Sequence, residues 1–167
     1  MRKALVSAVA FALFLAAGVA GQEASTELKD FIRVLKGDGL QLSLVHLNSK
    51  TVPAMFQPPT LYSIRARAAA STLLYVQGTP DEDVDLDTTN FVAMQGGESI
   101  TSVPANISNF EKGKAAKGVR VTGLLQFAKQ VDVSKAFTIV HGKDSVEFKF
   151  SDAQVKAITA PPAPPQQ

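Results

Sequence analysis

The sequence contains no cysteine and no tryptophan, and these absences exclude several classes of protein. Without cysteine there are no disulfides, no thioether-linked haem, no thiolate zinc site, no cysteine nucleophile and no lipid-modified N-terminal cysteine. Without tryptophan, and with two tyrosines, the chain has few of the aromatic platforms on which sugars stack. We therefore expect a fold that is held together by apolar burial alone.

Sequence motifs of common catalytic sites are also missing. The chain has no Gly-x-Ser-x-Gly elbow, no His-Glu-x-x-His helix and no phosphate-cradling glycine loop. Its two histidines, His46 and His141, each lie near the end of a predicted strand. A catalytic pair or metal site would require them to meet a carboxylate in space. We expect surface or partly buried histidines and a protein that is not an enzyme.

The first residues have the layout of a secretory signal peptide. Arg2 and Lys3 are positive, the run from Ala4 to Ala17 is uncharged and apolar, and small residues follow. Cleavage after Ala20 or Gly21 is predicted, and an uncleaved membrane anchor is the alternative. We expect an exported protein, periplasmic or extracellular, with no stable membrane insertion once residues 1–21 are removed.

Loss of that segment leaves a neutral chain. The full sequence has 17 basic and 15 acidic residues, and two of the basic ones are Arg2 and Lys3, so 15 of each sign remain. Nucleic-acid binding depends on basic side chains that neutralise phosphates. A neutral chain has no general attraction of this kind, and we expect no nucleic-acid partner.

Several short segments alternate apolar and polar residues, as strands with one buried face do. Gly142-Lys143-Asp144 is a hairpin-turn signal, and Gly123 predicts a bulge or a close backbone approach. Pro53, Pro58 and Pro59 predict a non-helical connection. The predicted strands lie within residues 40–47, 61–67, 71–78, 91–94, 119–127, 136–141 and 145–150.

Two segments at the ends favour helix. In residues 25–36 the apolar side chains fall at helical spacing, although a strand that turns at 37–39 and returns along 40–47 is the rival interpretation. Residues 151–158 predict a final helical turn capped by Ser151 or Asp152. The proline-rich residues 160–167 predict an extended tail.

These elements predict a mainly β protein. About seven short strands with regular turn signals are typical of a single antiparallel, immunoglobulin-like β-sandwich. The sandwich would span residues 22–159, with a short N-terminal helix as an optional addition. A small β-barrel is the alternative fold.

A family resemblance adds to this expectation. An Asn-Phe pair, a glycine-bounded loop and the late strand "GLLQF" at Gly123–Phe127 recur in that order within residues 60–150. This order resembles the immunoglobulin-like accessory domains of exported bacterial proteins of unassigned function. The resemblance implies export and a β-sandwich, and it brings no catalytic residues. Many of those proteins are lipoproteins, from which this cysteine-free chain departs.

The acidic stretch "DEDVDLD" has the most closely spaced carboxylates of the sequence. Asp81, Asp83, Asp85 and Asp87 recur at period two and would share one face of a strand. The helix-loop-helix calcium signature fails here because its glycine and glutamate positions are not filled. A looser calcium site between strands is one hypothesis, and a solvated strand face that protects a sheet edge is the other.

We therefore expect an exported, non-catalytic protein-interaction or accessory module with an unidentified protein partner in the cell envelope. Arg65 and Arg67, on one face of a predicted strand, are candidates for contact with an acidic partner. The alternative function is a calcium or small-ligand binding module that uses Asp81–Asp87. No other cofactor is expected.

Overall fold

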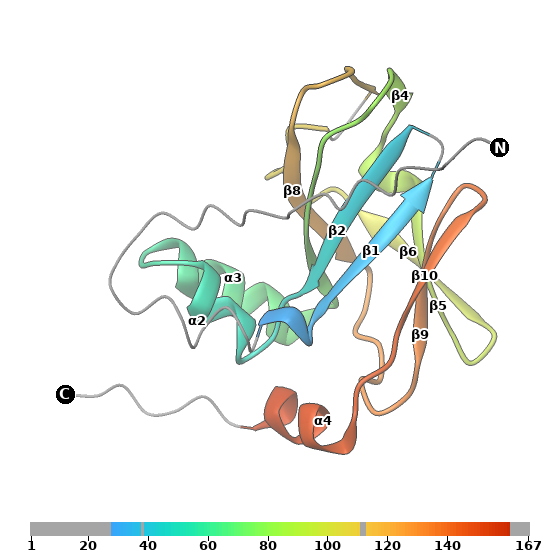
Figure 1. Ribbon diagram of the computed structural model, residues 1–167. Helices are drawn as coiled ribbons and strands as arrows, with labels where there is room; N and C mark the ends of the chain where they lie inside the picture. The colour runs from blue at the N-terminus through green and yellow to red at the C-terminus, as the bar shows by residue number, and fades with distance from the viewer. Residues whose placement is uncertain (1–27, 38, 111–112, 161–167) are drawn as a thin grey trace, which may run out of the picture.

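The computed structural model describes residues 28–37, 39–110 and 113–160, and its main feature is one curved antiparallel sheet (Figure 1). Its eight strands run in the order β1-β2-β3-β8-β6-β5-β9-β10. They are β1 (Ile32–Gly37), β2 (Leu40–His46), β3 (Leu73–Gly78), β5 (Phe91–Gln95), β6 (Glu98–Val103), β8 (Val121–Phe127), β9 (Phe137–His141) and β10 (Asp144–Phe148).

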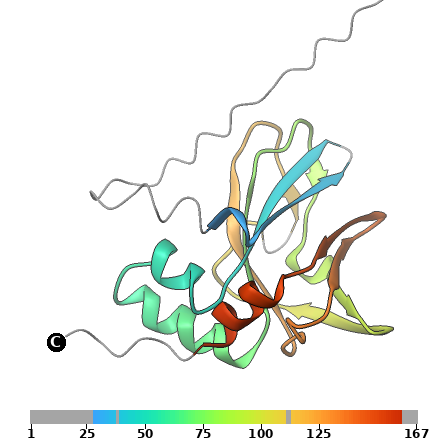
Figure 2. The same ribbon diagram turned by 60° about the horizontal axis from the view of Figure 1, so that its bottom comes forward.

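The remaining elements are short. Strands β4 (Val84–Asp85) and β7 (Lys114–Ala115) pair with each other outside the large sheet, and η1 (Thr88–Asn90) is one 3-10 turn before β5. The helices are α2 (Thr51–Met55), α3 (Thr60–Ala70) and α4 (Asp152–Thr159). Figures 1 and 2 show all three gathered at one end of the sheet.

The sheet nearly closes into a barrel. Its two edge strands, β1 and β10, lie against each other, and Arg33 spans the seam by donating from Nη2 to the Lys149 carbonyl at 3.1 Å. Strand β8 pairs with β3 on one side and with β6 on the other, so the two halves form one sheet. The mainly β prediction and the barrel alternative are confirmed, and the seven-strand sandwich is wrong because its two separate sheets do not form.

Two apolar clusters lie on the two faces of the sheet. The barrel interior holds fully enclosed phenylalanines, and the rings of Phe137 and Phe148 stack with centroids 5.1 Å apart. Because neighbouring side chains of a strand point to opposite faces, Leu73 and Leu124 pack outward while Leu74 and Leu125 pack inward. Helices α2 and α3 cover the outer cluster, so this part of the sheet is buried on both of its faces.

The predicted strand over residues 61–67 is wrong, since these residues lie in helix α3. Its alternation is coincidental, because on the helix only Ile64 is buried. The alanines of 66–70 favour helix more strongly than that pattern favours strand. Pro53 also lies inside a helix, contrary to the non-helical prediction, and is tolerated there because first-turn N–H groups need no helical partner.

The helix predicted over 25–36 is also wrong beyond its first turn. Leu28 and Lys29 form a helical turn, after which β1 pairs with β2 from Ile32 to Gly37. The turn uses Gly39 at a φ of 68°. The rival strand interpretation is therefore confirmed, because a full antiparallel ladder outweighs local helical spacing. Residues 25–27 lie outside the described part of the chain.

Other sequence predictions are confirmed. Strands form over 40–46, 73–78, 91–95, 121–127 and the 137–148 hairpin, and Ser151 caps α4 in a capping box with Gln154. A Cβ on Gly123 would overlap Ser108, whose hydroxyl bonds both the N–H and the carbonyl of Leu124, so the predicted close approach exists. Strand β6 is an addition that the sequence patterns did not indicate.

The predicted signal segment, residues 1–21, lies outside the described residues, as does the proline-rich tail after Ala160. Among the helices of the described part, none has both the length and the apolar composition to cross a bilayer.

Candidate functional site

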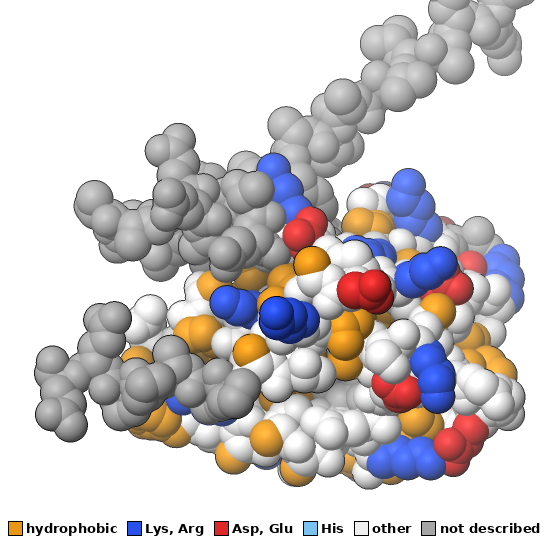
Figure 3. All heavy atoms as spheres, turned by 90° about the horizontal axis from the view of Figure 1, so that it is seen from below, with side chains coloured by type: hydrophobic (Ala, Val, Ile, Leu, Met, Phe, Trp, Pro, Cys, Tyr) orange, Lys and Arg blue, Asp and Glu red, His pale blue; other side chains and the backbone are white. Residues whose placement is uncertain are grey.

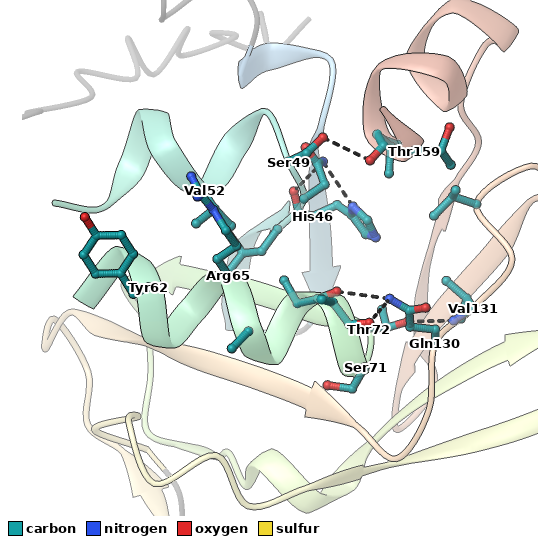
Figure 4. A pocket seen from close by; sticks show the side chains of 17 residues that line it. His46, Ser49, Val52, Tyr62, Arg65, Ser71, Thr72, Gln130, Val131 and Thr159 are labelled. Atoms are coloured by element: carbon teal, nitrogen blue, oxygen red, sulfur yellow. Dashed lines mark hydrogen bonds between the residues drawn. The ribbon is translucent and has the colours of Figure 1, made fainter. Parts of the chain in front are cut away.

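A cavity of about 650 Å³ lies between the three helices and the adjoining end of the sheet. This volume is within the range of small-molecule sites. Helices α2 and α3 form one side, and α4 and the segment after β8 form the other (Figure 4). Most of its wall is aliphatic, contributed by Leu47, Val52, Ala66, Ala68, Ala69, Val131, Val133 and Ile158.

His46, the last residue of β2, presents one ring nitrogen to the cavity and the other to Asn48. The Asn48 amide oxygen accepts from the backbone N–H groups of Lys50 and Thr51, at 2.8 and 3.1 Å. The amide nitrogen of Asn48 is therefore the group that donates to His46 Nδ1, at 3.3 Å. Because Nδ1 accepts, the proton of the neutral ring is on Nε2.

The environment of His46 keeps its ring neutral. The residue is 5% exposed and packs among aromatic rings, with the Phe150 centroid 5.3 Å away in an edge-on contact. Burial, which disfavours the charged form, lowers the pKa of His46 from 6.5 to about 4. The prediction of a surface or partly buried histidine is wrong here, since Phe137, Phe148 and Phe150 of the inner cluster enclose the ring.

The Nε2–H of His46 is a hydrogen-bond donor without a partner among the described residues. The one fully enclosed side-chain polar atom that lacks a partner in that part of the chain is Thr88 Oγ1. His46 Nε2 does not belong to that class, and His46 is one of the residues that line the cavity.

Other polar groups around the cavity are already engaged. Gln130 Nε2 donates to the carbonyls of Ala68 and Ala69 at 3.1 and 3.0 Å, and Thr72 Oγ1 accepts from the Val131 N–H at 2.7 Å. The Ser49 hydroxyl donates toward two carbonyls near the end of α4, at 2.9 and 3.0 Å. These bonds hold the walls together and leave a mainly apolar surface.

Tyr62 and Arg65 of α3 lie at the opposite side of the cavity from His46 (Figure 4). Both are exposed, so this side, which we call the mouth, is open to solvent. Arg67 does not share their position, since its Nη1 donates to the Ala105 carbonyl at 2.9 Å. The predicted common face for Arg65 and Arg67 is wrong because residues two apart on a helix diverge.

The acidic stretch is spread over a bend, a short strand and a cap. Within 81–87, only Val84–Asp85 is strand, so the four aspartates do not share a strand face. Asp83 Oδ1 accepts from the Lys117 N–H at 2.8 Å, and Asp87 Oδ1 accepts from the N–H and hydroxyl of Thr89. Asp81 is exposed, and its backbone N–H donates to the Gly39 carbonyl at 2.8 Å. In the described ranges no three His, Asp or Glu side chains are placed to hold one metal ion.

Millimolar calcium is accordingly expected to leave the melting temperature and the titration heat unchanged. The reason is that Asp83 bonds to the Lys117 N–H after β7, Asp87 bonds to nearby Thr89, and Asp85 belongs to a separate short ladder. Calorimetry with calcium, and with magnesium as the control cation, measures this. A saturable heat with calcium that is lost in Asp83→Asn would contradict the expectation.

His141 lies away from His46. Its ring stacks on Phe91 with centroids 4.4 Å apart, and it lines a small cavity of about 100 Å³ with Leu35 and Asp144. Burial lowers the pKa of His141, and the nearby Asp144 carboxylate opposes that shift. The two histidines line different cavities and do not form the pair that a metal or catalytic site would need.

Sequence reasoning missed this cavity because one part of its wall, Tyr62, Arg65 and Ala66, belongs to the segment 61–67 that was predicted as strand. The four alanines within 66–70 were the available signal for α3. His46, which follows the apolar run from Leu42 to Val45, carried a weaker signal of burial.

Comparisons with known proteins do not assign a family. No family model and no curated protein matches the chain. Among solved structures it is similar to a functionally unknown protein from Listeria monocytogenes EGD-e, with a TM-score of 0.40 and 12% identity over 73% of this chain and 84% of that chain. This likeness says nothing of what either protein binds, and the resemblance to immunoglobulin-like accessory domains stays a prediction.

Proposed function

We propose that this protein is a non-catalytic binding module that takes a small, mainly apolar ligand into the cavity between His46 and α3. The observation that carries the proposal is a cavity of about 650 Å³ with a mainly aliphatic wall, lined by His46 at one side and by α3 at the other. The proposal keeps the expected small-ligand function and moves its site away from Asp81–Asp87. Export and a protein partner in the cell envelope stay predictions from the sequence.

The energetics of apolar burial support this function. Apolar surface removed from water contributes about 25 cal/mol per Å². A ligand whose apolar body covers the aliphatic walls would gain this stabilisation, while the hydrogen bonds of Gln130 and Thr72 hold those walls in place.

The hydroxyl groups nearby favour binding over catalysis. A serine nucleophile needs a base within hydrogen-bond reach, and here Ser49 donates to α4 carbonyls while Ser71 donates to the Arg67 carbonyl at 3.2 Å. His46 Nδ1 is occupied by Asn48. None of the residues that line the cavity is an aspartate or glutamate.

Octanol is a neutral probe for this proposal. In a two-dimensional NMR titration it is expected to shift the amides of cavity residues such as Leu47, Val131 and Ile158. Ala69→Leu should weaken this binding roughly tenfold, because the added side chain fills part of the cavity. Ala70→Leu is the matched control, since Ala70 ends the same helix and does not line the cavity.

Two results would overturn the proposal. One is an octanol titration in which the shifts do not cluster around the cavity. The other is equal weakening by Ala69→Leu and Ala70→Leu, which would mean that the substitutions act through helix α3 as a whole.

A further inference from the structure

We infer that the ligand is an apolar monocarboxylate whose anionic group lies against Arg65 and whose hydrocarbon body extends toward His46. This inference rests on the proposed function and names the class of ligand. It follows from the distribution of charge around the cavity and from the guanidinium of Arg65, which has no partner among the described residues.

Among the residues that the structure describes, the cavity has a positive group at its mouth and no negative one. Arg65 is the one cationic side chain among the described residues that line it, His46 is neutral, and no aspartate or glutamate lines it. An anion entering this cavity meets attraction from Arg65 and no opposing carboxylate on the wall. A cation of the same shape would meet repulsion.

Arg65 is also unengaged. Arg33 and Arg67 each donate to backbone carbonyls, and Arg120 donates to Gln77 Oε1 at 2.7 Å. Arg65 makes no hydrogen bond or ion pair with any residue that the structure describes. Its planar guanidinium, which matches a carboxylate with two parallel hydrogen bonds, is therefore available at the mouth.

The positions of Arg65 and His46 set the direction of the ligand. Figure 4 shows Arg65 and Tyr62 on one side of the cavity and His46, Val131 and Thr159 on the other. A carboxylate at the mouth keeps part of its hydration, whereas full burial near the aromatic cluster behind His46 would be costly. Figure 3 views the molecule from this end and shows hydrophobic side chains at its surface. The apolar body thus points inward and the charge outward.

A charge series at constant chain length tests the inference. Octanoate should bind roughly fivefold more tightly than octanol, and octylamine should bind more weakly than either, because the mouth is positive. Isothermal calorimetry or the NMR titration gives the three dissociation constants. The preference for octanoate should shrink as salt is raised, since the ion pair at Arg65 is exposed.

Arg65→Gln should abolish the preference for octanoate over octanol. Lys156→Gln is the matched control, because it removes one positive charge from α4, next to the cavity wall, without lining the cavity. It should leave the octanoate preference intact. An equal loss in both variants would overturn the inference in favour of a general field effect.

The outcomes separate this inference from the proposed function. Octanol binding in the cavity with no preference for octanoate would overturn the monocarboxylate and keep the proposed function. Failure of both octanol and octanoate to perturb the cavity residues would overturn both. Tighter binding of octylamine than of octanoate would overturn the assignment of Arg65 as the anchoring group.

Discussion

Acidification from neutral pH to a pH near 4 is expected to cost the protein about 3 kcal/mol of unfolding free energy through His46 alone. The pKa of His46 is about 4 in the folded protein against 6.5 when the ring is solvated. As the pH falls, the unfolded chain therefore binds a proton first. The stabilisation is complete above pH 6.5 and is lost progressively between 6.5 and about 4.

Urea unfolding of the protein and of His46→Gln at neutral pH and near pH 4 measures this effect. The variant should lose about 3 kcal/mol less than the parent over that interval, whatever its absolute stability. His141→Gln is the control, because its ring is only half-buried and the Asp144 carboxylate opposes the shift of its pKa. Equal acid losses in the parent and in His46→Gln would show that His46 is not buried as described.

Phe148→Ala is expected to lower the free energy of unfolding by about 4 kcal/mol. The Phe148 ring is fully enclosed, stacks on Phe137 at 5.1 Å, and lies under the Arg33 guanidinium at 5.7 Å. Its removal leaves a cavity in the barrel and takes away the aromatic backing of His46, 6.4 Å away. Guanidinium unfolding at neutral pH measures the change.

Phe56→Ala provides the matched comparison. Phe56 is half-buried and makes one edge-on contact with Tyr75 at 6.3 Å, so its loss should cost only about 1–2 kcal/mol. Similar losses for Phe56→Ala and Phe148→Ala would contradict a single barrel core centred on the Phe137–Phe148 stack.

The hairpins of this fold follow from the sequence because their signals are local. In β9 and β10 the alternation of Val146 and Phe148 with polar residues agrees with a turn at Gly142, whose φ is 59°. The capping box of Ser151 with Gln154 likewise fixes the start of α4. In these segments the pattern, the turn residue and the partner strand all favour the same structure.

Sheet closure could not be deduced from alternation. A sandwich and a nearly closed barrel need the same in-and-out pattern, and the difference depends on whether β8 pairs on both of its edges. Only two residue pairs, Ser102 with Phe127 and Val103 with Gln126, join β8 to β6. So few pairs leave no recognisable pattern in the sequence.

The candidate site could not be predicted from the sequence for a related reason. Its walls come from the end of β2, from α3, from the segment after β8 and from α4, which are far apart in the sequence. Arg65 could be noted as a charged residue, but its separation from Arg67 depends on helix rather than strand. The burial of His46 depends on Phe137, Phe148 and Phe150, which lie far from it in the sequence, and Asn48 fixes its tautomer.

A crystal structure of the protein grown with octanoate tests the central claim most directly. The account predicts one octanoate between α3 and α4, its carboxylate within hydrogen-bond distance of Arg65 and its chain directed toward His46. Octanoate bound only outside this cavity, or a cavity that stays free of it at saturating concentration, would contradict the claim.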